Sequence, residues 1–293
     1  MMNSILHTGA TVSDIEWQKK FLLETLSMTI LSDLPREGGW IDATTGLKGF
    51  QSQTVYLTPD ERSKIELFHL FRPQLLPVPL TYGAYIGLCH IGLQTSDPVQ
   101  RIASMSKYRL QLNFVEEDGA EGGFLVQDNS GLAWQLQTNA QVGAGGIRLS
   151  HTRMIVSDLD RSLSVYTVLL GLTVQTTETK KVMLQDRNTQ WRTTEAEVYA
   201  LASDSGQTIE MCQYKDLIPL PNPRKKLNSK GLHHLAFYSE DAHSIFSRLS
   251  DFGCTPLSTP QAIPMGPNKG GFVFYFFDPD GISLEILQTP TPK

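Results

Sequence analysis

Histidines and acidic residues recur at fixed spacings along this chain of 293 residues. Four histidines each stand seven positions before an aspartate, and they are His7, His90, His151 and His234. The first and second of them are 83 positions apart, as are the third and fourth. Internal repetition of this kind indicates that one structural unit occurs several times. The sequence therefore predicts four related modules.

Each module also ends in an apolar segment that contains one acid or amide. These residues are Glu66, Gln135, Glu210 and Glu285. Burying a carboxylate among apolar neighbours costs free energy unless it is paired, hydrogen-bonded or bound to a metal. A single strand histidine or glutamate is usually structural or faces solvent, but four matched pairs require a shared partner. Neutral imidazoles and carboxylates together suit a divalent transition metal.

The C-terminal half carries the complete ligand set. We expect His151, Glu210, His234 and Glu285 to bind one divalent ion of Fe, Ni, Zn, Co or Mn. Two imidazoles and two carboxylates leave two positions of an octahedron for substrate oxygens or water. A weaker second site is expected at His7, Glu66, His90 and Gln135, where a neutral amide replaces one charged ligand. The alternative for that half is a degenerate site that only maintains the fold.

Helices and strands must position these residues. Each aspartate that follows a histidine stands where a helix N-cap belongs. Residues 14–28 and 158–172 place apolar residues at helical spacing, and shorter helices are expected over 97–110 and 241–252. Gly253 is expected to end the last of these helices. Alternating segments after each helix predict strands, so the fold class is α+β.

Two residues beside the ligands require separate predictions. His233 directly precedes His234, and alternation along a strand places it on the opposite face, outside the site. Tyr275 lies on a strand near Glu285, where its phenol could point into the cavity as a catalytic group. The alternative for Tyr275 is a position in the hydrophobic core.

Composition excludes several classes of function. The hydrophobic content is 40% and the net charge is -5, with no basic face for a phosphate backbone, so nucleic acid is not an expected partner. No apolar stretch is long enough to cross a membrane, and no signal peptide is recognisable, so we expect a soluble cytoplasmic protein. The three cysteines lack CxxC spacing, which predicts buried thiols. A monomer and a homodimer are both compatible with the sequence.

The chain resembles the vicinal-oxygen-chelate superfamily, which includes glyoxalase I, methylmalonyl-CoA epimerase, fosfomycin-resistance proteins and type I extradiol dioxygenases. The resemblance is strongest in the segments LSHTRMIVSDLDRSLSVYTVLLGL, GLHHLAFYSED and FVFYFFDPDGISLEI, and in the N-terminal half it depends mainly on spacing. It implies four βαβββ modules, paired into domains of residues 1–140 and 147–293. Each domain would have curved mixed sheets that enclose a cavity.

The resemblance also implies a function. His151, Glu210, His234 and Glu285 correspond to the metal ligands of bacterial glyoxalase I. This correspondence predicts an isomerase, lyase or epimerase in which a metal chelates vicinal oxygens of a small apolar substrate and the two glutamates transfer a proton.

Two alternatives stay open. An Fe(II) extradiol dioxygenase would use His151, His234 and Glu285, although the chain lacks the additional histidines of those enzymes. A ligand-sequestering resistance protein would bind a small molecule without turnover.

Overall fold

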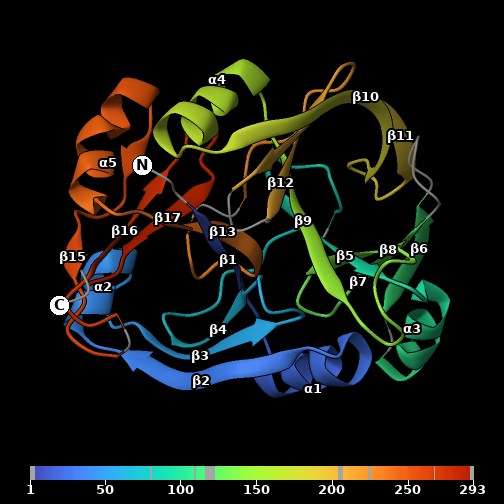
Figure 1. The fold of residues 1–293 in the computed structure, drawn as a ribbon, viewed down its shortest axis with the longest axis horizontal. Coiled ribbons are helices and arrows are strands. Elements are labelled where there is room, and N and C mark those ends of the chain that lie inside the picture. Colours follow the sequence, from blue (N-terminus) through green and yellow to red (C-terminus); the bar gives the residue numbers. More distant parts are fainter. Residues whose placement is uncertain are drawn as a thin grey trace.

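The chain folds into two large mixed β-sheets with short helices packed against them (Figure 1). The computed structural model describes residues 4–79, 81–108, 110–115, 123–203, 207–223, 226–266 and 268–290. Strands dominate and helices are few, which confirms the expected α+β class. No helix among the described residues has the length and hydrophobicity needed to cross a bilayer.

Each module begins with a strand and a capped helix, as the sequence predicts. The caps are Asp14, Asp97, Asp158 and Asp241, and each carboxylate accepts a hydrogen bond from the backbone N–H three residues later. The helices that follow are α1 (Ile15–Leu26), α3 (Pro98–Ser104), α4 (Leu159–Leu163) and α5 (Ala242–Arg248). These four N-caps are therefore confirmed.

The helices end differently from one another. The helix α4 continues as a π-helical segment, Ser164–Leu169, and α5 continues as a 3-10 turn, Leu249–Phe252. Gly253 closes that turn with a φ of 67°, as expected for a glycine at a helix end. The helices α1 and α3 are shorter than the predicted ranges 14–28 and 97–110, and a short 3-10 turn, Ser106–Tyr108, follows α3.

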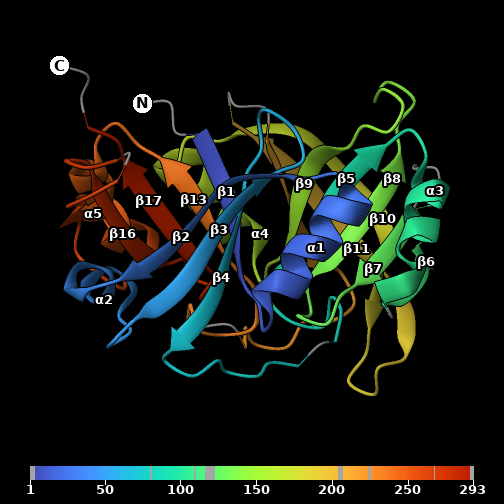
Figure 2. The same ribbon diagram turned by 90° about the horizontal axis from the view of Figure 1, so that it is seen from below.

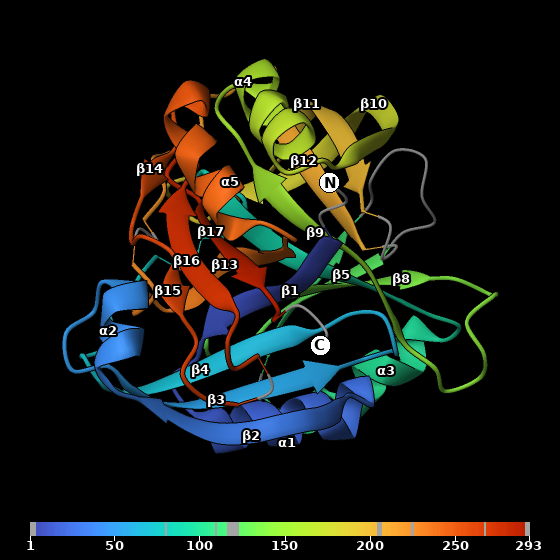
Figure 3. The ribbon, with the colours of Figure 1, turned by 60° about the vertical axis from the view of Figure 1, so that its left-hand side comes forward.

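The first sheet combines the first and last modules. Its main strand order is β14-β16-β17-β13-β1-β4-β3-β2, with β15 added beside β16. The strands from the first module are β1 (Ser4–Thr11), β2 (Thr29–Glu37), β3 (Gln51–Thr58) and β4 (Ile65–Arg72). Those from the last module are β13 (Gly231–Tyr238), β14 (Thr255–Pro256), β15 (Gln261–Ala262), β16 (Phe272–Phe277) and β17 (Ser283–Gln288). A further short helix, α2 (Gly39–Thr45), lies between β2 and β3 and packs near β15 and β16 (Figure 3).

The second sheet combines the two middle modules. Its strand order is β10-β11-β12-β9-β5-β8-β7-β6. The strands of the second module are β5 (Gly87–Thr95), β6 (Gln111–Val115), β7 (Gly123–Gln127) and β8 (Ala133–Thr138). Those of the third module are β9 (Arg148–Ile155), β10 (Thr173–Gln185), β11 (Trp191–Ala202) and β12 (Thr208–Tyr214).

This pairing differs from the one expected from the sequence. The first strand of the first module pairs with that of the last, and β5 pairs with β9, both antiparallel. The sheets therefore do not coincide with the expected domains 1–140 and 147–293, because each sheet takes one module from each half (Figure 2). Modules that are adjacent in sequence instead meet through their helices, α1 with α3 and the segments after α4 and α5 with each other.

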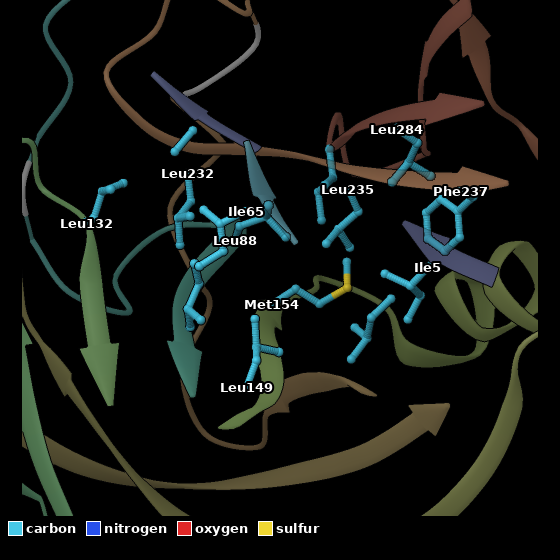
Figure 4. Packing of buried hydrophobic residues seen from close by; sticks show 14 of the residues in the cluster. Ile5, Ile65, Leu88, Leu132, Leu149, Met154, Leu232, Leu235, Phe237 and Leu284 are labelled. Carbon is cyan, nitrogen blue, oxygen red and sulfur yellow. The ribbon is translucent and has the colours of Figure 1, made fainter. Parts of the chain in front are cut away.

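One continuous hydrophobic core lies between the two sheets. Residues from both sheets share it, including Ile65, Leu235 and Leu284 from the first and Leu88 and Met154 from the second (Figure 4). Burial of such side chains stabilises a fold by roughly 1.5 to 3 kcal/mol each. The shared core joins the four modules into one unit.

The strand pairing predicts the behaviour of a C-terminal fragment. A fragment of residues 147–293 would lose β1 and β5, which leaves the edges of β13 and β9 unpaired. Unpaired strand edges associate with other chains. We therefore expect this fragment to self-associate, as measured by light scattering after size-exclusion chromatography. A fragment that is monomeric and unfolds cooperatively would contradict the observed pairing.

Candidate metal centre

A β-bulge precedes each of the four repeated histidines. Where β1 pairs with β13, the register skips Leu6 and His233, the residues directly before His7 and His234. Where β5 pairs with β9, it skips Cys89 and Ser150, directly before the other two histidines. A bulge locally breaks side-chain alternation and redirects the neighbouring side chains. The same backbone irregularity, a β-bulge, therefore sets the position of each of the four histidines.

Small residues allow the histidine rings to cross the opposite strand. In the β1–β13 pair, Gly9 lies opposite His234 and Ala236 lies opposite His7. A Cβ atom on Gly9 would lie 1.8 Å from Cε1 of His234, so this ring occupies the space that any side chain at position 9 would need. In the second sheet, a Cβ atom on Gly92 would likewise lie 2.2 Å from Cε1 of His151.

The acidic residues come from the strands on either side of this central pair. Gly9 pairs with Glu66 on β4, and Ala236 pairs with Glu285 on β17. The neighbours of both glutamates in sequence belong to the hydrophobic core, so alternation directs the carboxylates to the opposite face. Two histidines and two glutamates therefore converge on one face of the first sheet.

We call His7, Glu66, His234 and Glu285 the β1/β13 cluster. All four side chains are buried, and their ligand atoms lie within 4.8 Å of one another. The two Nε2 atoms are 3.1 Å apart, and their distances to the two Oε2 atoms are 3.1 to 3.4 Å. Ligands about 2.1 Å from a metal, at angles of about 90 to 109°, are themselves about 3.0 to 3.4 Å apart. The spacing matches that of ligands around one transition-metal ion.

The Oε2 atom of Glu66 provides an independent test of this fit. It is buried, and among the described residues it has no hydrogen-bond partner. Yet Nε2 atoms of His7 and His234 lie 3.1 and 3.3 Å away. A buried carboxylate oxygen that lacks a hydrogen bond is stabilised when a cation binds it. The donor set therefore fits a divalent cation.

The electrostatics of the β1/β13 cluster also favour a bound cation. Burial alone would lower the pKa of His7, but the carboxylates of Glu66 and Glu285 outweigh burial and raise it to about 10. Burial would raise the pKa of Glu285, but hydrogen bonds from both histidines lower it to about 2. Burial would also raise the pKa of Glu66, but the positive charge of His7 lowers it below its usual value. The carboxylates thus stay ionised and attract positive charge, whether a proton or a metal ion.

Two tyrosines face the carboxylates. The phenol of Tyr275 donates a hydrogen bond of 2.8 Å to Oε2 of Glu285. Tyr56 pairs with Glu66 across β3 and β4, just as Tyr275 pairs with Glu285 across β16 and β17. Burial and the adjacent carboxylates raise the pKa of both phenols well above the usual value. Tyr56 was not singled out from the sequence, although it stands ten residues before Glu66, as Tyr275 does before Glu285.

The structure separates the ligand set expected from the sequence. Of that set, His234 and Glu285 lie in the β1/β13 cluster, whereas His151 and Glu210 lie in the other sheet. The weaker expected set is divided in the same way, because His7 and Glu66 join the β1/β13 cluster and His90 pairs with His151. The physical reason is the module pairing, since each cluster needs the first strands of two modules side by side.

The second sheet holds the β5/β9 cluster, formed by His90, Gln135, His151 and Glu210. Gln135 pairs with Gly92 as Glu66 pairs with Gly9, so the layout is the same. Nε2 atoms of the two histidines are 3.0 Å apart. Among the described residues, however, only the β1/β13 cluster has three or more His, Cys, Asp or Glu ligand atoms close enough together to hold one metal ion.

Protein cations neutralise the acid of the β5/β9 cluster. Arg153 stands two residues after His151, where the other modules have Gly9, Gly92 and Ala236. Its guanidinium donates bonds of 2.9 and 2.6 Å to Oε2 of Glu210, and the ammonium of Lys180 lies 3.7 Å from Oε1. Burial and Arg153 hold the pKa of His90 well below its usual value. Positive charge is therefore already present where the first sheet has room for a metal.

Comparison with known proteins agrees with this architecture. Residues 148–286 match the model of the Glyoxalase/Bleomycin resistance protein/Dioxygenase superfamily. The C-terminal half of the chain therefore belongs to this superfamily. The resemblance inferred from the sequence motifs is thereby confirmed.

Two curated relatives match about half of the chain. A 2-epi-5-epi-valiolone epimerase of Actinomyces sp is 28% identical over 154 residues, which cover 50% of this chain and 81% of the relative. A probable lactoylglutathione lyase of Vibrio cholerae is 27% identical over 143 residues, which cover 48% of this chain and 90% of the relative.

Solved structures match nearly the whole chain. Glyoxalase I from Zea mays has a TM-score of 0.68 at 15% identity, covering 98% of this chain and 92% of that one. A putative dioxygenase from Bacillus subtilis has a TM-score of 0.60 at 14% identity, covering 98% and 86%. At these identities the likeness concerns the fold alone.

The crossing of the His234 ring over Gly9 can be tested by substitution. In Gly9→Ala the added methyl group would overlap the ring, so His234 must move away from the β1/β13 cluster. We expect the free energy of unfolding to fall by about 1 to 3 kcal/mol, as overpacking usually costs, together with loss of Zn(II) binding. Gly143→Ala is the matched control, because its Cβ would meet no atom within 4 Å. Unchanged Zn(II) affinity in Gly9→Ala, measured by calorimetry, would argue against the described ring position.

Proposed function

We propose that the protein is a divalent-metal-dependent enzyme that moves a proton within a small substrate bearing two neighbouring oxygens. The reaction class is that of a glyoxalase-like isomerase, lyase or epimerase. The observation that carries the proposal is the buried β1/β13 cluster, whose four ligand atoms lie within 4.8 Å of one another. Its residues replace the set expected from the sequence.

The donor set indicates which ions would bind. His7, Glu66, His234 and Glu285 would hold Fe, Ni, Zn, Co or Mn(II), which accept imidazole and carboxylate ligands. Such an ion supplies a Lewis acid that stabilises negative charge developing on substrate oxygens.

The two glutamates are the groups we assign to proton transfer. In the strand order β17-β13-β1-β4 the strands that carry Glu285 and Glu66 flank the strands that carry the histidines. The carboxylates therefore approach a shared substrate from opposite sides. One carboxylate removes a proton from a carbon next to a carbonyl group. A carboxylate then returns the proton either to the neighbouring carbon or to the opposite face of the same carbon. Proton transfer thus involves Glu66 in place of the expected Glu210.

The tyrosines adjust the carboxylates. The phenol of Tyr275 stays protonated and donates to Glu285, which stabilises the ionised form of that carboxylate. Tyr56 has the corresponding position beside Glu66. A carboxylate that is held by a phenol keeps its orientation when a substrate proton approaches. Tyr275 thereby retains the role beside the site that its position in sequence predicts.

The relatives support this reaction class. One is named an epimerase and the other a lactoylglutathione lyase. We therefore take 2-epi-5-epi-valiolone and lactoylglutathione as the first substrates to assay. The dioxygenase alternative needed His151, His234 and Glu285 together, and His151 lies in the other sheet, so we do not propose it. A sequestering protein has no need of four converging metal ligands.

Replacement of single glutamates tests the proposal. We expect the wild type to bind one Zn(II), Ni(II) or Co(II) per chain, measured by elemental analysis after dialysis. Glu66→Gln and Glu285→Gln each remove a charged ligand. Changing a residue that only supports a metal ligand lowers metal affinity by up to about 100-fold, so loss of a ligand itself should lower it by more than that. Turnover of the named substrates should fall in parallel.

Glu210→Gln is the matched control, since this residue occupies the same strand position in the β5/β9 cluster. It should keep full metal content and activity and lose only stability, because Arg153 would lose its ionised partner. The proposal fails if Glu66→Gln and Glu285→Gln retain wild-type metal content. It also fails if Glu210→Gln is the variant that loses the metal.

The pH dependence of metal binding follows from His7. Its pKa of about 10 means that the metal-free protein keeps a proton there near neutral pH, and a metal ion must displace that proton. Affinity for Zn(II) should therefore rise as pH increases from about 7 to 9, by about tenfold per pH unit for each proton displaced. Calorimetry in two buffers of different ionisation enthalpy measures the protons released. Affinity that is constant over this range would show that no proton competes with the metal.

A further inference from the structure

A chain of three hydrogen bonds leads from His234 to a backbone carbonyl in the segment before β13. Nδ1 of His234 lies 2.9 Å from Nδ1 of His233. Nε2 of His233 lies 2.9 Å from Oγ1 of Thr11, whose hydroxyl donates a 2.7 Å bond to the carbonyl of Leu227. All four residues are buried, with exposed fractions of 0 to 3%. The chain joins the first module, the last module and the segment between the third and fourth modules.

The β-bulge explains why His233 takes part. Alternation predicted that its side chain would point away from His234, but His233 is the residue that the register skips. Its ring instead packs beside His234, with centroids 4.9 Å apart, and stacks on Phe68 with an interplanar angle of 3°. The expectation that His233 lies outside the site is therefore corrected. The bulge residue Ser150 is placed similarly in the second sheet, where its hydroxyl lies 2.9 Å from Nδ1 of His151.

The carbonyl of Leu227 determines the direction of every bond in this chain. A carbonyl oxygen can only accept, so the single hydroxyl proton of Thr11 is directed to it. Oγ1 of Thr11 must then accept from Nε2–H of His233. A neutral His233 has no proton left on Nδ1, so that atom accepts from Nδ1–H of His234. A neutral His234 consequently presents a bare Nε2 to Glu66, Glu285 and His7.

We infer that His233 and Thr11 are positioning residues that fix the tautomer and ring orientation of His234, so that its Nε2 is directed at a bound cation. The inference rests on the proposed function, because it assigns a role to a metal ligand. Partners of the second ring nitrogen commonly orient metal-bound histidines. Here that partner is another histidine, held in turn by a threonine and a carbonyl.

The other histidine of the β1/β13 cluster has no equivalent support. The bulge residue before His7 is Leu6, which has no polar side chain. Among the described residues, none forms a hydrogen bond with Nδ1 of His7. The two imidazoles are therefore unequal, since within the described residues the hydrogen-bonded contacts of His7 all involve Nε2, whereas His234 is held at both ring nitrogens.

Substitutions at Thr11 test the inference with matched controls. Thr11→Val keeps the shape of the side chain but removes the acceptor for His233, whereas Thr11→Ser keeps the hydroxyl. Thr8→Val is a second control, because Thr8 is a buried threonine on the same strand whose hydroxyl bonds to Thr152 instead. We expect Thr11→Val to weaken Zn(II) binding by about 10- to 100-fold, and both controls to stay close to wild type.

Nitrogen-15 NMR of the Zn(II)-loaded protein gives a readout that general loss of packing would not produce. In the wild type, Nε2 of His233 should show the shift of a protonated nitrogen and Nδ1 that of an unprotonated one. In Thr11→Val the two shifts should move toward each other, because the hydroxyl that accepts the Nε2 proton is then removed. Thr11→Ser should restore the wild-type pattern.

The outcomes separate this inference from the proposed function. If the wild type binds no divalent cation, the proposed function fails, and the positioning of a metal ligand fails with it. If the wild type binds Zn(II) but Nδ1 of His233 carries the proton, only the inference is overturned. Wild-type affinity in Thr11→Val would likewise overturn the inference alone.

Discussion

Two ionised carboxylates and two imidazoles cannot remain buried within 4.8 Å of one another without positive charge among them. The rest of the first sheet follows from this constraint. The His234 ring crosses the neighbouring strand at Gly9, where a Cβ atom would overlap it. The outer strands then bring one carboxylate to each side, and their apolar neighbours anchor them in the core.

The second sheet satisfies the same constraint with charges from the protein itself. Its histidines and strands are arranged in the same way, but the guanidinium of Arg153 and the ammonium of Lys180 lie beside Glu210. The two clusters thus share a backbone arrangement, but only in the second sheet do an arginine and a lysine of the described chain lie beside the acid, whereas we propose an exchangeable cation for the first. This difference explains why equivalent repeats need not have equivalent functions, although they share backbone geometry.

The sequence was sufficient to predict the modules, the aspartate N-caps, the superfamily and the residue types of the ligands. It did not predict which modules pair, because the histidine and glutamate spacings are the same whichever modules stand side by side. A cue was present at Arg153, since a cation two residues after a histidine, where the other modules have glycine or alanine, can neutralise the acid of its own cluster. The role of His233 was missed for a separate reason, because strict alternation does not hold at a β-bulge.

The first sheet unites the first and last of the four modules, since β1 precedes and β17 follows every other described strand. During synthesis on the ribosome, the middle modules can pair as soon as the third has emerged. The strand that carries His7, however, stays without its proper neighbour until the last module leaves the exit tunnel. The proposed metal site therefore lacks two of its four ligands, His234 and Glu285, until the last module has been synthesised.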